Sequence, residues 1–543
     1  MGLPNVVYIL ADDMGYGDVR YLNPECKFPT PNLDRIGREG MIFTDAHSSS
    51  SVCTPSRYSI LTGRYCWRTY LKGGVTHGAD DALIDEGRET VASLLKKAGY
   101  KTALVGKWHL GWTWGIKDGH EDPINRAANT GDGGAMDWID YEKPVTNGPT
   151  SRGFDYSYCI PASLDMPPYV YVENNMPVEV PTRWSDKDGL CRPGWRMESM
   201  EWNTVLPHFT EKVVELIEGY ASGTPDAAET RRAPGRADAD GRPGGPALPE
   251  EGQGGRRPFF LYFPLNAPHT PIAPADEFKG KSGINLYADF CMEVDHRVGQ
   301  ILDALDRTGQ ADNTLIIFTT DNGASWGPSE CETLEKDFGH YCSHIYRGYK
   351  SDIWDGGHRL PFLARWPAAV QPGSSCDQRI GIFDLLATAA EITGQQIPDN
   401  AGEDCESFLP ALKGQAIDES RREGLVHHSI GGMFALRRGK WKLCRCPGSG
   451  GWGKGDLTDQ AAREEGLPEI QLYDMVADPG EKENLVEKHP EIVKELTELL
   501  HRYVATGRST PGPEQQNAPE VPLENWRQLN WLPEIPQEFV VSD

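Results

Sequence analysis

The sequence has no apolar run close to the roughly 20 residues that a membrane-spanning helix needs. Its 12 cysteines form no paired C-x-x-C motif, so a structural zinc site is not expected and no disulfide pairing is indicated. Basic residues are few, because 54 Lys and Arg face 80 Asp and Glu and give a net charge of −26. This charge disfavours binding to nucleic acid or to an anionic membrane. Any anionic ligand must therefore meet a local basic pocket.

The first residues also lack the basic segment and the small-residue cleavage site of a secretory signal. They lead directly into the apolar run from Val6 to Leu10, which indicates a core strand. We expect an exported protein, periplasmic, extracellular or lysosomal, whose leader is not part of this chain. A cytoplasmic protein is the alternative.

The first half of the chain alternates short apolar strands with helical patterns, which indicates an α/β fold with a mostly parallel sheet covered on both faces. The predicted strands are Val6 to Ala11, Thr102 to Gly106, Phe259 to Pro264 and Leu315 to Thr320. The predicted helices are Pro31 to Glu39 and Leu286 to Asp306. In such sheets ligands bind beyond the carboxyl ends of the strands, so the polar residues that follow these strands are the first candidates for a site.

The length predicts two domains. We assign residues 1–418 to a large catalytic domain and residues 419–543 to a small C-terminal α+β domain and tail, because the pattern changes there to short strands and one helix. Residues 222–257 are rich in Gly, Pro, Ala, Arg and Asp, which predicts a disordered surface insertion. We expect Trp526 and Trp531 in the tail to pack against the body.

The most specific motif begins at Cys53. It consists of Cys53-Thr54-Pro55-Ser56-Arg57, followed by Leu61-Thr62-Gly63-Arg64. The residues from Pro55 onward are typical of a helix start, which places residue 53 at the positive end of a helix where an anion is favoured. A single cysteine would be interpreted as a buried structural residue, but the spacing of the whole motif favours a functional one.

Two further groups follow predicted strands. One is the motif Gly106-Lys107-Trp108-His109. The other combines Asp12 and Asp13 with Asp321 and Asn322, each pair at the end of a strand. Acidic residues at strand ends are common in turns, so each pair alone is weak evidence. Together their oxygen atoms suit a hard cation such as Ca²⁺ or Mg²⁺ better than zinc or copper.

These motifs resemble the two signatures of the formylglycine-dependent sulfatases, C-x-P-x-R-x-x-x-L-T-G and a segment that ends in G-K-W-H. The nearest likeness is to arylsulfatase-A-like enzymes that act on sulfated glycans, and it extends to the C-terminal segment Leu472-Tyr473-Asp474. It implies an alkaline-phosphatase-like α/β core with a smaller C-terminal domain. It also implies that a separate formylglycine-generating enzyme oxidises Cys53 to formylglycine. One hydroxyl of the hydrated aldehyde then attacks sulfur, and the second expels sulfate.

The resemblance assigns roles to individual residues. The cation ligands would be Asp12, Asp13, residue 53, Asp321 and Asn322, with Ca²⁺ as the ion and Mg²⁺ as the alternative. The catalytic residues would be Cys53, Arg57, Lys107, His109, His269 and Lys350. Among these, Lys107 contacts sulfate, His109 acts on the hydroxyl that expels sulfate, and His269 is the general acid. Arg57 orients residue 53, Lys350 contacts the bridging oxygen with His269, and Ser163 donates a hydrogen bond to sulfate.

A framing motif of the family is present with one change. The segment Asp355-Gly356-Gly357-His358-Arg359-Leu360-Pro361 carries Asp where the family usually has Glu. We expect this change to affect the framework of the site more than its chemistry.

The predicted substrate is a sulfated carbohydrate of galactose or N-acetylgalactosamine type. Aromatic rings between Asp118 and Asn174 are candidates to stack on sugars, namely Trp138, Tyr141, Tyr156, Tyr158, Tyr169 and Tyr171. Polar candidates to bind sugar hydroxyls are His340, His344, Arg347 and His428. Because the acidic surface offers no long basic groove for a polyanion, removal of sulfate from chain ends is favoured.

Two other functions stay open. The first is a phosphomonoester or phosphonate hydrolase of the same superfamily, although no second metal cluster can be assembled from the loops. The second is a catalytically silent glycan-binding protein in which Cys53 stays a thiol. The presence of Lys107, His109 and the metal carboxylates argues against it.

Overall fold

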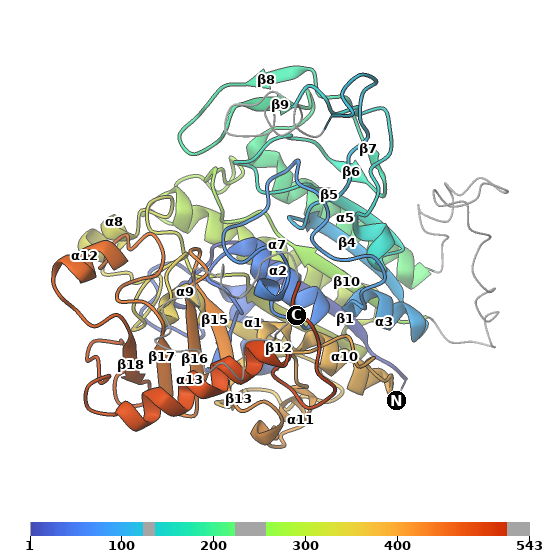
Figure 1. Ribbon diagram of the computed structural model, residues 1–543. Helices are drawn as coiled ribbons and strands as arrows, with labels where there is room; N and C mark the ends of the chain where they lie inside the picture. Colours follow the sequence, from blue (N-terminus) through green and yellow to red (C-terminus); the bar gives the residue numbers. More distant parts are fainter. Residues whose placement is uncertain (1, 123–135, 223–256, 519–543) are drawn as a thin grey trace.

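The computed structural model describes residues 2–122, 136–222 and 257–518 (Figure 1). Its main sheet has ten strands in the order β13-β2-β12-β11-β1-β10-β4-β5-β6-β7. Their bounds are β1 Asn5–Ala11, β2 Met41–Phe43, β4 Lys101–Lys107, β5 Tyr156–Ile160, β6 Val172–Glu173, β7 Met176–Pro177, β10 Phe259–Pro264, β11 Thr314–Thr320, β12 Phe362–Arg365 and β13 Ser374–Cys376.

The five central strands, β11, β1, β10, β4 and β5, are parallel. Tyr8 at the centre of β1 pairs with Tyr262 of β10 on one side and Ile317 of β11 on the other. All four predicted strands are confirmed, and β10 has the predicted bounds. Antiparallel strands flank this centre, because β12 pairs with β11 and β6 pairs with β5 in that sense. The predicted α/β fold is thereby confirmed.

The helices form two packed groups that cover the sheet. The first comprises α1 Pro31–Glu39, α5 Val205–Ser222 and α7 Leu286–Arg307, and the second comprises α2 Cys53–Thr62, α3 Val91–Lys97 and α10 Leu385–Thr393. Helix α1 begins and ends where the sequence predicts, with Pro31 in the first turn and Gly40 after the last. In the part of the chain that the structure describes, no helix combines the length and apolar character needed to cross a bilayer.

The C-terminal region folds as a small antiparallel sheet with a long helix. The strands are β15 Leu425–His428, β16 Phe434–Arg438, β17 Trp441–Cys444 and β18 Gln471–Asp474, and α13 Pro490–Ala505 contacts β16 and β17 (Figure 1). The predicted α+β region is present, and the boundary at residue 419 stays a prediction. The predicted insertion, apart from its two ends, and the tail with Trp526 and Trp531 lie outside the described residues.

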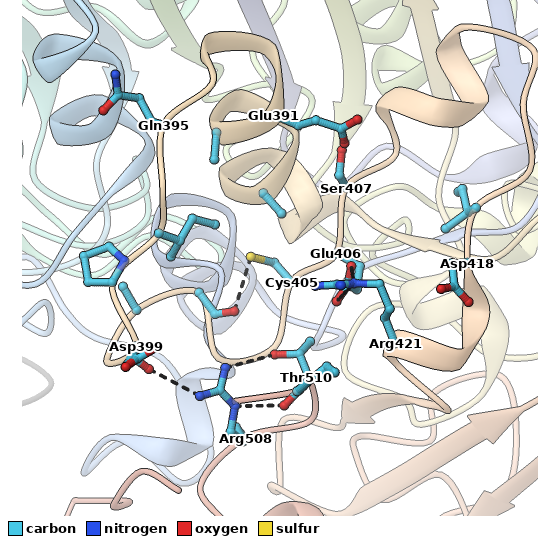
Figure 2. A pocket seen from close by; sticks show the side chains of 18 of the residues that line it. Glu391, Gln395, Asp399, Cys405, Glu406, Ser407, Asp418, Arg421, Arg508 and Thr510 are labelled. Carbon is cyan, nitrogen blue, oxygen red and sulfur yellow. Dashed lines mark hydrogen bonds and ion pairs between the residues drawn. The ribbon is translucent and has the colours of Figure 1, made fainter. Parts of the chain in front are cut away.

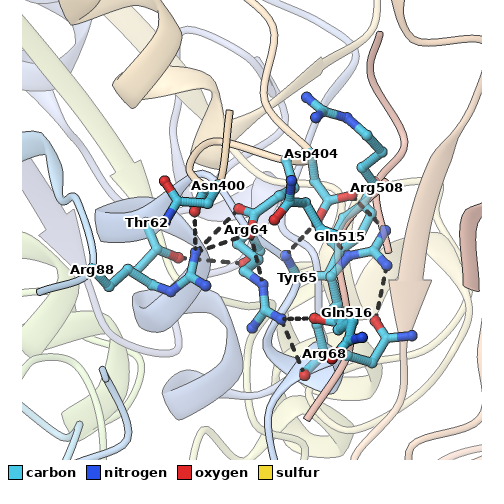
Figure 3. Close-up of polar contacts among 12 residues, drawn as sticks. Thr62, Arg64, Tyr65, Arg68, Arg88, Asn400, Asp404, Arg508, Gln515 and Gln516 are labelled. Carbon is cyan, nitrogen blue, oxygen red and sulfur yellow. Dashed lines mark hydrogen bonds and ion pairs between the residues drawn. The ribbon is translucent and has the colours of Figure 1, made fainter. Parts of the chain in front are cut away.

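Helix α2 is buried over its whole length, and a charged network fixes its C-terminal end (Figure 3). The backbone N–H of Asp404 donates to the carbonyl of Gly63 at 2.9 Å, and Asp404 forms an ion pair with Arg68 at 2.7 Å between Oδ1 and Nη2. Glu403 pairs with both Arg64 and Arg88, at 3.1 and 3.0 Å. Because Asp404 and Arg68 are buried, neither charge has water as an alternative partner.

The residues that follow Glu403 and Asp404 in the chain, Cys405 and Glu406, line a cavity of about 530 Å³ beside α10 (Figure 2). Its charged side chains are largely engaged, because Arg421 pairs with Glu406 and Arg508 donates to backbone carbonyls including that of Asp399. None of the residues predicted to form the functional site lines this cavity.

Gly106, which precedes Lys107 on β4, occupies a position that no other residue fits. Its φ is +133°, and a Cβ atom there would lie 1.9 Å from the carbonyl oxygen of Pro264. We expect Gly106→Ala to lower the thermal unfolding temperature strongly, since a backbone clash adds to a conformational strain of about 1–3 kcal/mol. The control is Gly99→Ala, where φ is +89° but the space is open. Equal unfolding temperatures for the two variants would contradict this packing argument.

Asp404→Ala should destabilise the fold by about 3–5 kcal/mol, because it leaves the buried guanidinium of Arg68 without its carboxylate. The matched control is Glu406→Ala in the same segment, whose partner Arg421 is exposed, and here about 1 kcal/mol or less is expected. Differential scanning calorimetry of both variants provides the measurement. A loss for Asp404→Ala no greater than that of the control would show that the network does not hold α2.

Candidate functional site

Side chains from widely separated segments meet at the carboxyl ends of the parallel strands. Strand β1 leads into Asp12 and Asp13, β11 into Asp321 and Asn322, β4 into Lys107 and His109, and β10 into His269, while α2 contributes Cys53 and Arg57. Lys350 lies on the segment that precedes the short helix α9 Asp355–His358. The contacts below join these side chains into one cluster, called here the carboxyl-edge cluster.

Three carboxylates and three basic side chains pair within this cluster. The Nζ atom of Lys107 lies 2.7 Å from Oδ2 of Asp12, and Nζ of Lys350 lies 2.7 Å from Oδ1 of Asp13. Asp321 accepts from Nε of Arg57 at 2.9 Å and lies 2.8 Å from its Nη2 atom. All six side chains are buried, so the pairs are held in a medium where unpaired charge is costly.

The two carboxylates nearest Arg57 titrate differently. Burial alone would raise the pKa of Asp12, but Lys107, His269 and Arg57 together hold that pKa well below its usual value. Burial and the negative charge of Asp12 raise the pKa of Asp321 to about 6. The two carboxylates thus differ in how readily they take up a proton, and a cation bound beside them would favour the ionised form of Asp321.

Several oxygen atoms of the cluster fit a metal ion. Oδ1 of Asp12 and Oδ1 of Asn322 are buried without a hydrogen-bond donor, while Nδ2 of Asn322 donates to Oδ1 of Asp13 at 2.7 Å. One ligand atom each of Asp12, Asp13 and His269 lies within 4.8 Å of the others. Buried acceptors without donors are rare unless an ion or water satisfies them. Carboxylate and amide oxygens are the ligands that Ca²⁺ and Mg²⁺ prefer.

Cys53 is the first residue of α2, so its side chain lies at the positive end of the helix. Burial raises the pKa of the Cys53 thiol, and the nearby Lys107 and Lys350 offset this only in part. A thiol of raised pKa is a poor nucleophile, because the thiolate is the reactive form. Unmodified cysteine is thus poorly suited to attack from this position.

His109 has a defined hydrogen-bonding role. Its Nε2 atom lies 2.7 Å from the carbonyl oxygen of Thr76 and must donate to it, which leaves Nδ1 as a buried acceptor without a partner. Burial, together with Lys107 and Arg57, lowers the pKa of His109 well below its usual value, so the ring is neutral. Sequence reasoning missed Thr76, which binds through its backbone and belongs to no motif.

His269 and Ser163 have polar atoms that remain available. Nδ1 of His269 donates to the carbonyl of Thr270 at 2.7 Å, and its Nε2 lies 3.7 Å from Oδ2 of Asp13. Ser163 follows β5, and its Oγ is buried without a hydrogen-bond partner. Both side chains are therefore free to bind a ligand at this edge.

The framing motif places the segment of Lys350 through close backbone contacts. A Cβ atom on Gly356 would lie 2.1 Å from the carbonyl oxygen of Gly348, and one on Gly357 would lie 2.4 Å from that of Asp352. The carboxylate of Asp355, the first residue of this motif, accepts a hydrogen bond from the buried Nζ of Lys442 at 2.8 Å. The aspartate at this position thus acts in the framework, outside the carboxyl-edge cluster.

The four predicted sugar-binding side chains have different positions. His340 is fully buried and bonded to Asp18 at 2.8 Å, and Arg347 forms a two-pronged ion pair with Asp456. Because His340 is fully buried against Asp18, the prediction that it binds a ligand is corrected. Arg347 is half-buried, and its role stays a prediction. His344 is half-buried beside Tyr16. His428 has a buried Nε2 without a partner, and its carbonyl accepts from the N–H of Ser51, close to Cys53.

The six predicted stacking rings are all buried, with exposed fractions of 2 to 8%. Tyr158 and Tyr171 pack on each other with ring centroids 5.3 Å apart, and Tyr141 packs edge-on against Trp114. The prediction that these rings form a stacking surface is wrong, because their faces are used in the core. Tyr169 also lines a pocket beside the hairpin of residues 183–196.

Comparisons with known proteins agree with this arrangement. The sequence profile of the Sulfatase family matches residues 4–176 and 247–395. The chain is 33% identical over 511 residues to an N-acetylgalactosamine-6-O-sulfatase of Bacteroides thetaiotaomicron, with 92% of each chain covered. It is 31% identical over 508 residues to arylsulfatase A of Bos taurus, covering 92% of this chain and 86% of that protein.

Solved structures give the same result. A structure described under the metabolism of multiple glycosaminoglycans by Bacteroides thetaiotaomicron superimposes with a TM-score of 0.73 at 30% identity, covering 92% of this chain and 99% of that chain. A phosphonate monoester hydrolase of Agrobacterium radiobacter shares the fold alone, at 16% identity and a TM-score of 0.53, with coverages of 92% and 94%. Because the family profile spans more than half of the sequence and the identities extend over nearly all of it, the chain belongs to the sulfatase family.

Proposed function

We propose that this sulfatase hydrolyses a sulfate ester of a carbohydrate with a formylglycine made from Cys53. The observation that carries the proposal is the position of Cys53, at the positive end of a buried helix and among three basic side chains, Arg57, Lys107 and Lys350. Formylglycine supplies a hydrated aldehyde with two hydroxyls on one carbon: one attacks sulfur and releases the alcohol, and loss of the proton from the other expels sulfate and restores the aldehyde. A thiol carries no second hydroxyl for the step that expels sulfate, so the proposed chemistry rests on the modification.

The cation is proposed to be Ca²⁺, with Mg²⁺ as the alternative. Asp12, Asp13, Asp321, Asn322 and residue 53 would hold it, since their atoms gather at one edge and two of the oxygens have no donor. When bound, it supplies positive charge that offsets charge growing on sulfate oxygens.

The chain's own residues then have separable tasks. Lys107 and Ser163 bind the sulfate oxygens, and Lys350 contacts the bridging oxygen. Arg57 fixes Asp321 and the carbonyl of Lys107. Nδ1 of His109 accepts a proton, because its Nε2–H is committed to Thr76. His269 donates a proton to the leaving oxygen from Nε2, since its Nδ1–H is committed to Thr270.

The proposed substrate is a terminal galactose or N-acetylgalactosamine that carries sulfate. The N-acetylgalactosamine-6-O-sulfatase relative at 33% identity supports the sugar class. His344 and His428 stay as candidates to bind sugar hydroxyls. The net charge of −26 supports action at chain ends, because an acidic surface disfavours an extended polyanion.

The protein produced together with a formylglycine-generating enzyme should yield a peptide containing residue 53 that is about 18 Da lighter than the cysteine form. Cys53→Ala should abolish hydrolysis of aryl sulfate without changing the circular dichroism spectrum. Cys376→Ala, at a half-buried cysteine away from the cluster, is the control and should stay active. An active preparation containing only the thiol at position 53 would refute the covalent mechanism.

Removal of the cation should lower turnover of aryl sulfate at least about 100-fold, because charge on the sulfate oxygens loses its counterion. Added Ca²⁺ should restore activity, and elemental analysis should follow both steps. Asn322→Leu, which removes an oxygen that lacks a donor, should weaken the apparent affinity for Ca²⁺ about 10-fold or more, whereas Asn313→Leu, at a half-buried residue before β11, should not. Full activity of the metal-free protein would overturn the assignment of the cation site. Turnover of aryl phosphate above that of aryl sulfate would favour the alternative function, a phosphomonoester or phosphonate hydrolase.

A further inference from the structure

Strands β8 Arg183–Ser185 and β9 Gly194–Arg196 form a hairpin (Figure 1). A pocket of about 240 Å³ lies beside it, and no residue of the carboxyl-edge cluster lines this pocket. Its walls combine three aromatic and three basic side chains, namely Tyr169, Trp184, Trp202, Arg183, Arg192 and Arg196. This volume is below the roughly 300–1,000 Å³ of pockets for drug-sized ligands, so it suits one small ring.

The aromatic side chains are fixed in position. Trp184 is 38% exposed, yet its ring is held edge-on by Trp195 with centroids 5.2 Å apart. Trp202 packs against Tyr169 at 4.9 Å and lies under the guanidinium of Arg196 at 4.6 Å. An exposed tryptophan held rigidly at a pocket is typical of a surface that binds a ligand with an apolar face.

The polar groups favour an uncharged ligand rich in hydroxyls. Arg183 pairs with Glu201 at 2.7 Å, Arg192 pairs with Asp165 at 3.2 Å, and two acidic residues also line the pocket, Asp186 and Asp188. The positive charges are therefore offset, which disfavours a site for a free anion. Donors and acceptors side by side suit neighbouring hydroxyl groups.

Two buried polar atoms, one in the wall of the pocket and one beside it, have no hydrogen-bond partner. They are Nε of Arg196, a donor, and Oδ1 of Asp165, an acceptor, on side chains that are 5% and 7% exposed. A native fold leaves few such atoms unsatisfied without a ligand or water. Arg196 lines the pocket, and Asp165 lies next to it through its pair with Arg192.

The pocket is connected to the carboxyl-edge cluster by a short segment. Ser163 lies two residues before Asp165 and six before Tyr169, and the backbone N–H of Arg192 donates to the carbonyl of Asp165 at 2.9 Å. Six residues span at most about 21 Å, the length of a few sugar units. The separation of Ser163 and Tyr169 is therefore within the length of one oligosaccharide.

We propose that the pocket beside β8 and β9 is a carbohydrate subsite that binds an uncharged pyranose ring of the substrate glycan, away from the sulfate that is removed. The ring stacks on Trp184 and bonds through its hydroxyls to Arg196 and its neighbours. The inference rests on the proposed action on a glycan and adds a determinant of chain length. It also explains why a hairpin at the surface displays a tryptophan.

The test compares a small aryl sulfate with a sulfated tetrasaccharide that ends in N-acetylgalactosamine, using the matured, Ca²⁺-loaded protein. Trp184→Ala should raise KM for the tetrasaccharide about 10-fold and leave kcat and the turnover of aryl sulfate unchanged. Arg196→Gln should act in the same direction. Leu190→Ala is the matched control, because Leu190 is 60% exposed in the same hairpin but does not line the pocket.

Isothermal titration calorimetry with the same tetrasaccharide after removal of its sulfate gives a readout independent of catalysis. The wild type and Leu190→Ala should bind it, and Trp184→Ala should bind at least about 10-fold more weakly. Equal binding and equal KM for Trp184→Ala and the wild type, or no binding by the wild type, would overturn the subsite. Binding that depends on Trp184 in a protein that hydrolyses no sulfate ester would support the subsite and refute the proposed function.

Discussion

The balance of three buried carboxylates against three buried basic side chains is the constraint on which the rest of the structure depends. Each pair joins segments distant in sequence, since Asp12 meets Lys107, Asp13 meets Lys350 and Asp321 meets Arg57. Buried charges are tolerated only when such pairs form. Because the six charges cancel, a divalent cation would leave the edge with a net positive charge, which suits an anionic ester despite the acidic surface.

Close backbone contacts at glycines position the side chains of the carboxyl-edge cluster. Gly106 lets β4 pass against Pro264, so that Lys107 reaches Asp12, and Gly356 and Gly357 let the segment of Lys350 approach. At the far end of α2, Asp404 and Glu403 hold the arginines that follow the helix. The charged network thereby fixes the C-terminal end of the helix whose first residue is Cys53 (Figure 3).

Strands and motifs were predictable because their signals are local. An apolar run followed by a polar residue is sufficient to find β1 and Asp12, and the spacing from Cys53 to Gly63 is sufficient to find α2. Thr76 was not predictable, because it acts through its carbonyl. The rings of Tyr158 and Tyr171 were misinterpreted, since sequence does not distinguish an aromatic face in the core from one at a ligand. The prediction that His340 binds sugar hydroxyls was wrong for the same reason, because burial against Asp18 leaves no pattern in the sequence.

The carboxyl-edge cluster draws its members from positions 12 to 350, across strands β1, β4, β10 and β11. No short stretch of the chain contains both the nucleophile position and all of its charged neighbours. A molecule in which the central strands are only partly assembled therefore has no partial version of the site. Turnover along a denaturant titration would therefore report on the molecules in which these central strands are assembled.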